Sequence, residues 1–201
     1  MSDSKHAILS ALRVQHPPDA ALPDLADGQW ITFADPAAQF NTVLVAVGGN
    51  CVFAPMIEEV RHELERLPAY STAAKVYSLV PGIESRNVDP HAIADPHELE
   101  DIDFAVLPGR FSVAENAAVW VTDEGVPHRA IYIIAQHVAL VVPATEIVHN
   151  MHQAYERLRF ERPGFGCFIS GPSKTADIEQ SLVIGAHGAR SLTVFLMKQF
   201  V

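Results

Sequence analysis

A chain of 201 residues with 49% apolar and 19% charged residues is long enough to bury a core, and this balance excludes extensive disorder. The formal net charge of −10 argues against an unaided nucleic-acid or anionic-membrane surface, because phosphate binding needs clustered Lys and Arg. No apolar run approaches the roughly twenty residues that a membrane span needs. The first residues are polar, so we expect a cytoplasmic protein without a membrane span.

Residues 4–14 place apolar side chains at helical spacing and predict a short docking helix. A polar, proline-bearing stretch through Trp30 follows and is typical of an ordered arm. We expect a single domain in which residues 1–34 form this helix and arm and residues 35–201 form an α/β core.

A helix is expected to begin at Asp35-Pro36, an N-cap followed by proline in the first turn. Its apolar positions recur at i, i+3, i+4 and i+7: Phe40, Val43, Leu44 and Val47. The helix stops at Gly48-Gly49. Because this pair closes a helix instead of following a strand, it does not form a dinucleotide-binding fingerprint.

Strands and helices then alternate along the chain. The expected strands are 51–53, 75–80, 103–107, 117–122, 130–134 and 137–142. The expected helices are 55–67 and 146–160, with a polar connection over 84–100 that contains a short helix. Strands 117–122 and 130–134 flank a long polar loop and predict a hairpin. The alternation predicts an α/β fold with a mostly parallel mixed sheet.

The last third predicts a strand at 167–169, a loop, a helix that ends at Gly185, and a strand at 192–197, together one βαβ unit. The loop that opens the helix carries small and hydroxylated residues whose N–H groups can point at an anion. We therefore expect a ligand site here. Its candidate residues are Gly171, Ser173, Thr175, Asp177 and His187.

The same segment comes close to a phosphate-binding P-loop without matching it. In the GxxxxGK[ST] pattern the lysine directly follows the last glycine, whereas Pro172 and Ser173 separate Gly171 from Lys174. Pro172 also removes one N–H of the cradle. We therefore do not predict a nucleotide triphosphatase.

Three residues are candidates for catalysis, and each has an alternative structural role. Asp177 suits either the first turn of a helix or ligand contact. His187 could act as an acid or base, or satisfy backbone carbonyls within its turn. Glu115, followed by Asn116, forms either a strand-entry turn or a second wall of the same site.

Metal and cofactor sites are not expected within this chain. Cys51 and Cys167 lie far apart in apolar strand contexts, and iron–sulfur or structural zinc sites need clustered thiolates. We interpret both as buried thiols, with a redox pair as the alternative. His149 and His152 could bind a metal with Glu146, but without a third firm ligand they fit a solvated helix face.

The run from Ser170 to Glu179, continued by residues 182–188, resembles the LUD-domain family, and most closely its lactate utilization protein C (LutC/YkgG) branch. Relatives typically show a Ser-Gly-Pro-Ser-x-Thr-Ala-Asp-Ile-Glu run followed by Gly-x-His-Gly-Pro. Two departures stand out: residues 116–118 replace the more usual Thr-Gly-Thr, and Ala189 replaces a common proline.

The resemblance implies a three-layer α/β/α sandwich of the NagB/RpiA/CoA transferase-like group. It also implies a role in the oxidation of L-lactate to pyruvate beside partner subunits that carry iron–sulfur clusters. Our first hypothesis is therefore an accessory subunit with a small anion pocket. The competing hypothesis is a stand-alone enzyme acting on a CoA thioester or sugar phosphate, with Glu115 as base or nucleophile.

Overall fold

The computed structural model describes residues 2–14, 20–21, 28–158, 164–175 and 183–198. Within them the helices are α1 (Ser2–Val14), α2 (Pro36–Ala46), α3 (Ile57–Arg66), α4 (Pro68–Ser71), the 3-10 helix η1 (Pro96–Leu99), α5 (Ile131–Ile134) and α6 (Met151–Arg157). None of these helices is long and apolar enough to cross a membrane.

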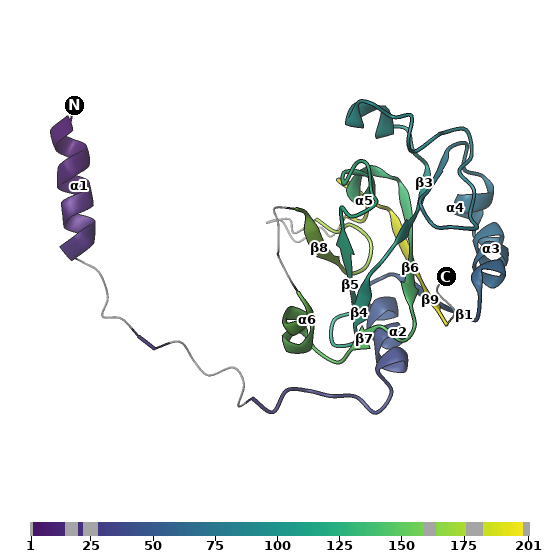
Figure 1. Ribbon diagram of the computed structural model, residues 1–201, viewed down its shortest axis with the longest axis horizontal. Coiled ribbons are helices and arrows are strands. Elements are labelled where there is room, and N and C mark those ends of the chain that lie inside the picture. The colour runs from purple at the N-terminus through teal and green to yellow at the C-terminus, as the bar shows by residue number, and fades with distance from the viewer. Residues whose placement is uncertain (1, 15–19, 22–27, 159–163, 176–182, 199–201) are drawn as a thin grey trace.

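The strands form two sheets (Figure 1). Sheet A is entirely parallel and contains β1 (Asn50–Ala54), β9 (Ser191–Met197), β6 (His137–Pro143), β3 (Phe104–Pro108) and β2 (Val76–Ser78), in that order. Sheet B is mixed and contains β7 (Ile147–Val148), β4 (Phe111–Val113), β5 (Ala118–Thr122) and β8 (Gly166–Ile169), in that order.

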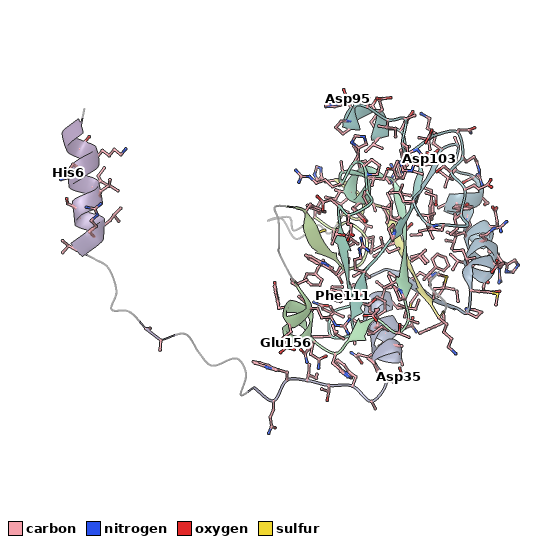
Figure 2. The ribbon with its side chains drawn as sticks, in the orientation of Figure 1. His6, Asp35, Asp95, Asp103, Phe111 and Glu156 are labelled. Carbon is pink, nitrogen blue, oxygen red and sulfur yellow. The ribbon has the colours of Figure 1, made fainter. Side chains whose placement is uncertain are left out.

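Helices and sheet B cover the two faces of sheet A. On one face, Val60 and Leu64 of α3 pack with Tyr70 of α4 against the sheet. On the other face, α2, α5 and sheet B share one apolar core with the strands. Helix α6 packs on the outer side of sheet B, where Phe111, labelled in Figure 2, joins Ala154. This arrangement confirms the predicted three-layer α/β sandwich.

Helix α2 follows its predicted boundaries. The Asp35 carboxylate accepts a hydrogen bond from the Ala38 N–H at 2.9 Å, and Pro36 occupies the first turn. Phe40 and Leu44 are fully buried against sheet A. The local sequence sets both the start of this helix and the face that it buries.

The predicted hairpin is wrong. Residues 131–134 form α5 instead of a strand, and β5 pairs with β4 and β8. A short run such as Ile-Tyr-Ile-Ile fits a strand or a helix equally well, so periodicity alone does not separate the two. Strand β4 escaped prediction because three residues are too few to show alternation.

The predicted terminal βαβ unit is also wrong. Strand β8 lies at an edge of sheet B, where Phe168 pairs with Trp120, whereas β9 lies inside sheet A between β1 and β6. A βαβ unit needs both strands in one sheet. The helix expected between them falls largely on residues 176–182, which lie outside the described residues.

The helix expected over 146–160 begins later than predicted. Ile147 and Val148 form β7, which pairs with β4, and α6 starts only after Asn150. The Asn150 side chain accepts a hydrogen bond from the Gln153 N–H at 3.0 Å and so fixes the N-cap.

Helix α1 forms as predicted, but it does not dock on the described part of the domain. The side chains of residues 4–14 are all exposed, including Ile8, Leu9 and Leu12. Figure 1 shows this helix apart from the α/β body.

Candidate functional site

The loop after β8 lies between sheet B and the end of α2. The Ser170 hydroxyl donates a hydrogen bond to the Asn116 carbonyl at 2.6 Å, which brings the loop beside the Glu115–Asn116 turn. Gly171 and Pro172 are buried. The Gly171 backbone has φ +71, and a Cβ there would lie 2.9 Å from the Val47 carbonyl oxygen. Glycine is therefore required for this close approach.

Residues 173–175 run antiparallel to residues 183–185. Lys174 and Ile184 form a β-bridge, and the Gly185 N–H donates to the Ser173 carbonyl at 2.9 Å. The Ser173 N–H donates to the Ala189 carbonyl at 2.9 Å, and the Thr175 N–H donates to the Val183 carbonyl at 3.1 Å. These two N–H groups are thus already used within the protein.

The Thr175 hydroxyl also has a structural role, because it accepts a hydrogen bond from the Val183 N–H at 3.1 Å. On the other side of the loop, a Cβ at Gly188 would lie 3.0 Å from the Ser173 Cβ and Oγ. The structure therefore brings Ser173 together with the His187–Gly188 turn, two features that the sequence placed in one site. Asp177 lies outside the described residues.

A cavity of about 490 Å³ opens beside this turn, between α5 and residues 185–190. We call it the α5 cavity. Ile133 and Ile134 form an apolar wall and are 54% and 40% exposed. His187 and Arg190 are exposed and form part of the polar wall. One side of the cavity can therefore receive a carbon chain and the other an anionic group.

Arg190 is the residue of this cavity that sequence reasoning missed. Its N–H donates to the Gln136 carbonyl at 2.7 Å, which fixes its backbone just before β9. Within the described part of the chain its guanidinium forms no ion pair. The sequence does carry a signal for Arg190: an anion pocket needs a positively charged side chain, and Arg190 is the cation that follows the His187–Gly188 turn.

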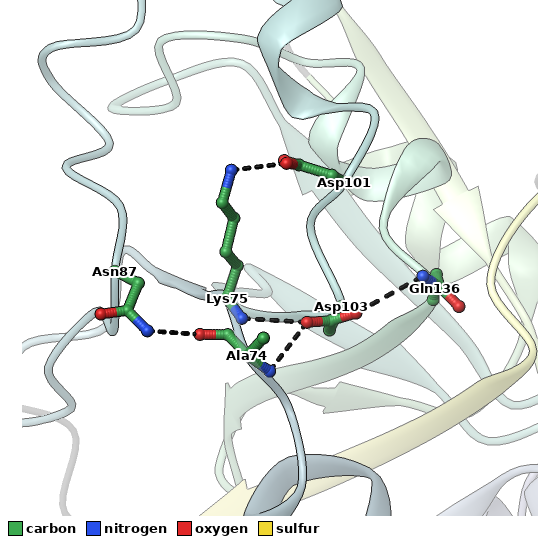
Figure 3. A network of polar contacts seen from close by, with 6 residues as sticks. All are labelled: Ala74, Lys75, Asn87, Asp101, Asp103 and Gln136. Atoms are coloured by element: carbon green, nitrogen blue, oxygen red, sulfur yellow. Dashed lines mark hydrogen bonds and ion pairs between the residues drawn. The ribbon is translucent and has the colours of Figure 1, made fainter.

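Gln136 anchors the back of the cavity to the start of sheet A. Its side-chain amide lies 3.5 Å from the Asp103 carboxylate, which accepts hydrogen bonds from the Ala74 and Lys75 N–H groups at 2.8 and 2.9 Å (Figure 3). The cavity thus sits at the amino ends of β6 and β9. In open α/β sheets ligands usually bind at the carboxyl ends, so this location is unusual.

His137 lies behind Arg190 at the start of β6. Its Nδ1 lies 2.8 Å from the Ser191 hydroxyl, so it is a hydrogen-bonded histidine of the sheet. Burial lowers the pKa of His137, and the nearby Arg190 cation lowers it further.

The Glu115–Asn116 turn is held by hydrogen bonds to its surroundings. The Glu115 carboxylate accepts from the Met151 N–H at 2.9 Å, at the first residue of α6. The Asn116 side chain accepts from the Ala118 N–H at 3.1 Å, and Ala117 adopts φ +53. The Glu115 carboxylate therefore satisfies a backbone N–H group at the start of α6. This contact fits the expected strand-entry turn and also links the turn to α6.

His149 and His152 hold the arm that precedes α2. The Phe33 N–H donates to His149 Nδ1 at 3.0 Å, and the Trp30 ring stacks on the His152 ring with centroids 3.3 Å apart. Glu146, the third candidate ligand, pairs with Arg157 at 2.7 Å. Through these contacts both histidines hold the arm on the surface of α6 and sheet B.

A further cluster of metal-ligating groups lies on α3 within the described residues. Glu59, His62 and Glu63 on α3 bring ligand atoms within 4.8 Å of one another, but Glu63 already pairs with Arg66 at 2.9 Å. Both cysteines are free and half-buried. Burial raises the pKa of the Cys51 thiol to about 12 and also raises the pKa of Cys167, which disfavours the metal-binding thiolate.

Comparison with known proteins places these features in a family. The LUD domain family model matches residues 96–197, which is 102 of 201 residues. The matched segment contains the Glu115 turn, the loop after β8 and the α5 cavity.

Two curated relatives are called lactate utilization protein C. The one from Bacillus mycoides is 32% identical over 105 residues, 44% of this chain and 43% of the relative. The one from Geobacillus kaustophilus is 27% identical over 169 residues, 78% of this chain and 66% of the relative. The matched part of the chain thus spans 43% of one relative and 66% of the other.

A solved structure supports the fold. A DUF162 family protein from Deinococcus radiodurans superposes with a TM-score of 0.61 at 17% identity, over 84% of this chain and 99% of that chain. Together with the family match over more than half of the sequence, these observations show that the chain belongs to the LUD domain family.

Proposed function

We propose that this protein is an accessory component of a system that oxidises L-lactate to pyruvate, and that it binds a small carboxylate in the α5 cavity. The role in lactate utilization is supported by the names of the curated relatives. The carboxylate is supported by the cavity itself, where the Arg190 cation faces the same space as an apolar wall.

The chemistry of a small organic acid fits this arrangement. A guanidinium can bind a carboxylate with two parallel N–H···O bonds, which fixes its orientation. The short carbon chain would then lie on Ile133 and Ile134 of α5. His187, at the rim, would donate to or accept from a hydroxyl or keto oxygen. Ser173 lies beside this turn and would border the ligand.

The proposed role leaves electron transfer to partner subunits that carry iron–sulfur clusters. Cys51 and Cys167 are the chain's two cysteines, and burial disfavours the thiolate of each. A chain with this cysteine content would depend on its partners for redox chemistry, and would contribute ligand binding and contacts.

No specific observation favours the competing enzyme on CoA thioesters or sugar phosphates. Its nucleophile or base would be Glu115, whose carboxylate accepts a hydrogen bond from the start of α6. The neighbouring Asn116 amide oxygen is also engaged within the turn.

The accessory role is tested by affinity purification of the tagged chain from lactate-grown cells, followed by mass spectrometry and an absorption spectrum. We expect co-purified proteins with the broad visible absorption of iron–sulfur clusters. A colourless protein that emerges without partners would contradict the accessory role.

The ligand is tested separately by calorimetric titration of the purified chain with L-lactate and pyruvate, and with lactamide as the uncharged analogue. We expect the acids to bind and lactamide to bind at least about 10-fold more weakly, because it lacks the charge that Arg190 recognises. Equal binding of acid and amide, or no binding at all, would refute the pocket.

A further inference from the structure

The two edge strands of sheet A differ in how their outer sides are covered. Strand β2 is protected by the chain that follows it. The Val76 N–H donates to the Arg86 carbonyl at 3.0 Å, and the Arg86 N–H donates back to Val76 at 2.8 Å. The Ser78 N–H donates to the Ser85 hydroxyl at 3.0 Å. Residues 85–86 therefore occupy the hydrogen-bonding groups of this edge.

Strand β1 has no such cover among the residues that the structure describes. Its backbone pairs with β9 on one side, and beyond that ladder residues 50–53 make no backbone hydrogen bond with the described part of the chain. Because successive backbone groups of a strand point to opposite sides, about half of the N–H and C=O groups of β1 face outward. Asn50 and Phe53 are exposed, Phe53 to 53%.

The sequence of β1 also lacks the devices that usually block an open edge. Natural proteins place lysine, proline, inward-pointing charge or a bulge on edge strands to prevent pairing with another chain. Strand β1 reads Asn-Cys-Val-Phe-Ala, with no charge and no proline, and it pairs with β9 in unbroken register. It is thus an open and uncharged template for strand addition.

We propose that β1 pairs antiparallel with β1 of a second copy of this chain, which joins two five-stranded sheets across a two-fold axis at Val52. With the axis at Val52, the third of the five residues, every residue of β1 lies opposite a residue of the second copy. Cys51 then lies opposite Phe53 of the partner subunit, and Asn50 lies opposite the partner's Ala54. Identical strands that carry no charge meet without like-charge repulsion.

Side chains beside β1 would extend this contact. Val45 on α2 and Met56 at the start of α3 are 57% and 45% exposed, and both helices contact β1. A stable interface buries about 1,200–2,000 Å² in total, more than a five-residue ladder supplies, so flanking apolar groups are needed. A second copy is favoured over an unrelated protein because it supplies the same strand at the same concentration, and two-fold dimers are the commonest assemblies.

The test is sedimentation velocity of the full chain over a range of concentrations, with Phe53→Lys and Ile133→Lys as matched variants. Ile133 is 54% exposed and lies on α5 instead of the edge strand. We expect the unaltered chain and Ile133→Lys to sediment as a dimer of about twice 21.9 kDa. We expect Phe53→Lys to raise the dimer dissociation constant at least about 10-fold, since the change acts on both copies.

Three results would overturn the proposal. They are a monomeric unaltered chain, a dimer that persists in Phe53→Lys, and a dimer that Ile133→Lys disrupts instead. A cooperative unfolding transition and a far-ultraviolet circular dichroism spectrum like that of the unaltered chain show that Phe53→Lys remains folded. Amide hydrogen exchange adds a direct readout: at concentrations where the dimer forms, residues 50–54 should exchange more slowly than in Phe53→Lys. None of these measurements depends on the ligand or on the proposed role in lactate utilization.

Discussion

The Glu115–Asn116 turn and the α5 cavity both carry polar side chains, but they use them differently. In the turn, the Glu115 carboxylate and the Asn116 amide oxygen accept hydrogen bonds from backbone N–H groups. In the cavity, His187 and Arg190 are exposed, and their side chains form no hydrogen bond or ion pair with another described residue.

This difference separates structural from ligand-binding candidates. A polar group whose hydrogen bonds are made inside the protein stabilises the fold and has less capacity left for a ligand. An exposed cation beside an apolar wall has that capacity. The sequence offered both Glu115 and His187 as candidates for catalysis, and His187 also as a ligand-binding residue. Of the two side chains, only that of Glu115 accepts a hydrogen bond within the described structure.

The largest effect is expected at Gly171, which lies in the loop that joins the two regions. An alanine there must adopt positive φ and place its Cβ 2.9 Å from the Val47 carbonyl oxygen. We expect Gly171→Ala to lower the free energy of unfolding by about 3 kcal/mol. The control is Gly125→Ala, because Gly125 has φ +73 but nothing within 4 Å. It should cost about 1 kcal/mol. Urea denaturation measures the free energy of unfolding of both variants. Equal losses would show that the close approach to the Val47 carbonyl oxygen costs no stability.

A smaller effect is expected at Glu115. Removal of its carboxylate leaves the Met151 N–H at the start of α6 without this partner. We expect Glu115→Ala to lower the free energy of unfolding by about 1 kcal/mol. Glu84→Ala removes an exposed carboxylate that forms no hydrogen bond or ion pair with the residues that the structure describes, and it should leave stability within about 0.5 kcal/mol. Denaturation curves that do not distinguish the two variants would show that the contact with α6 contributes nothing.

The smallest effect is the pH response of His137. Because burial and then Arg190 lower its pKa from the ordinary 6.5, the folded protein favours the neutral imidazole. Its contribution to stability is complete above about pH 6.5 and is lost as pH falls from there toward the lower folded pKa. Arg190→Gln removes the cation and should raise the pKa of His137, which NMR titration of the imidazole measures. Arg66→Gln, on α3, should leave it unchanged; an unchanged pKa in Arg190→Gln would mean that the guanidinium is not near His137.

The sequence predicted those elements whose signals are local. The cap at Asp35 and the apolar spacing of α2 identify that helix without any partner, and the structure agrees. The assignment of β8 and β9 to different sheets depends on strands far away in the chain, so periodicity did not reveal it. The loop after β8 was recognised from its motif. Arg190 was missed because its position depends on a backbone contact with Gln136, 54 residues earlier in the sequence.

The most direct test of the account is calorimetric titration of L-lactate into the unaltered chain, Arg190→Gln and Glu115→Gln. The account predicts that Arg190→Gln weakens binding at least about 10-fold, because it loses the charge that holds the carboxylate. It predicts that Glu115→Gln binds as the unaltered chain does. Loss of binding in Glu115→Gln with full binding in Arg190→Gln would contradict the account and place the ligand at the turn.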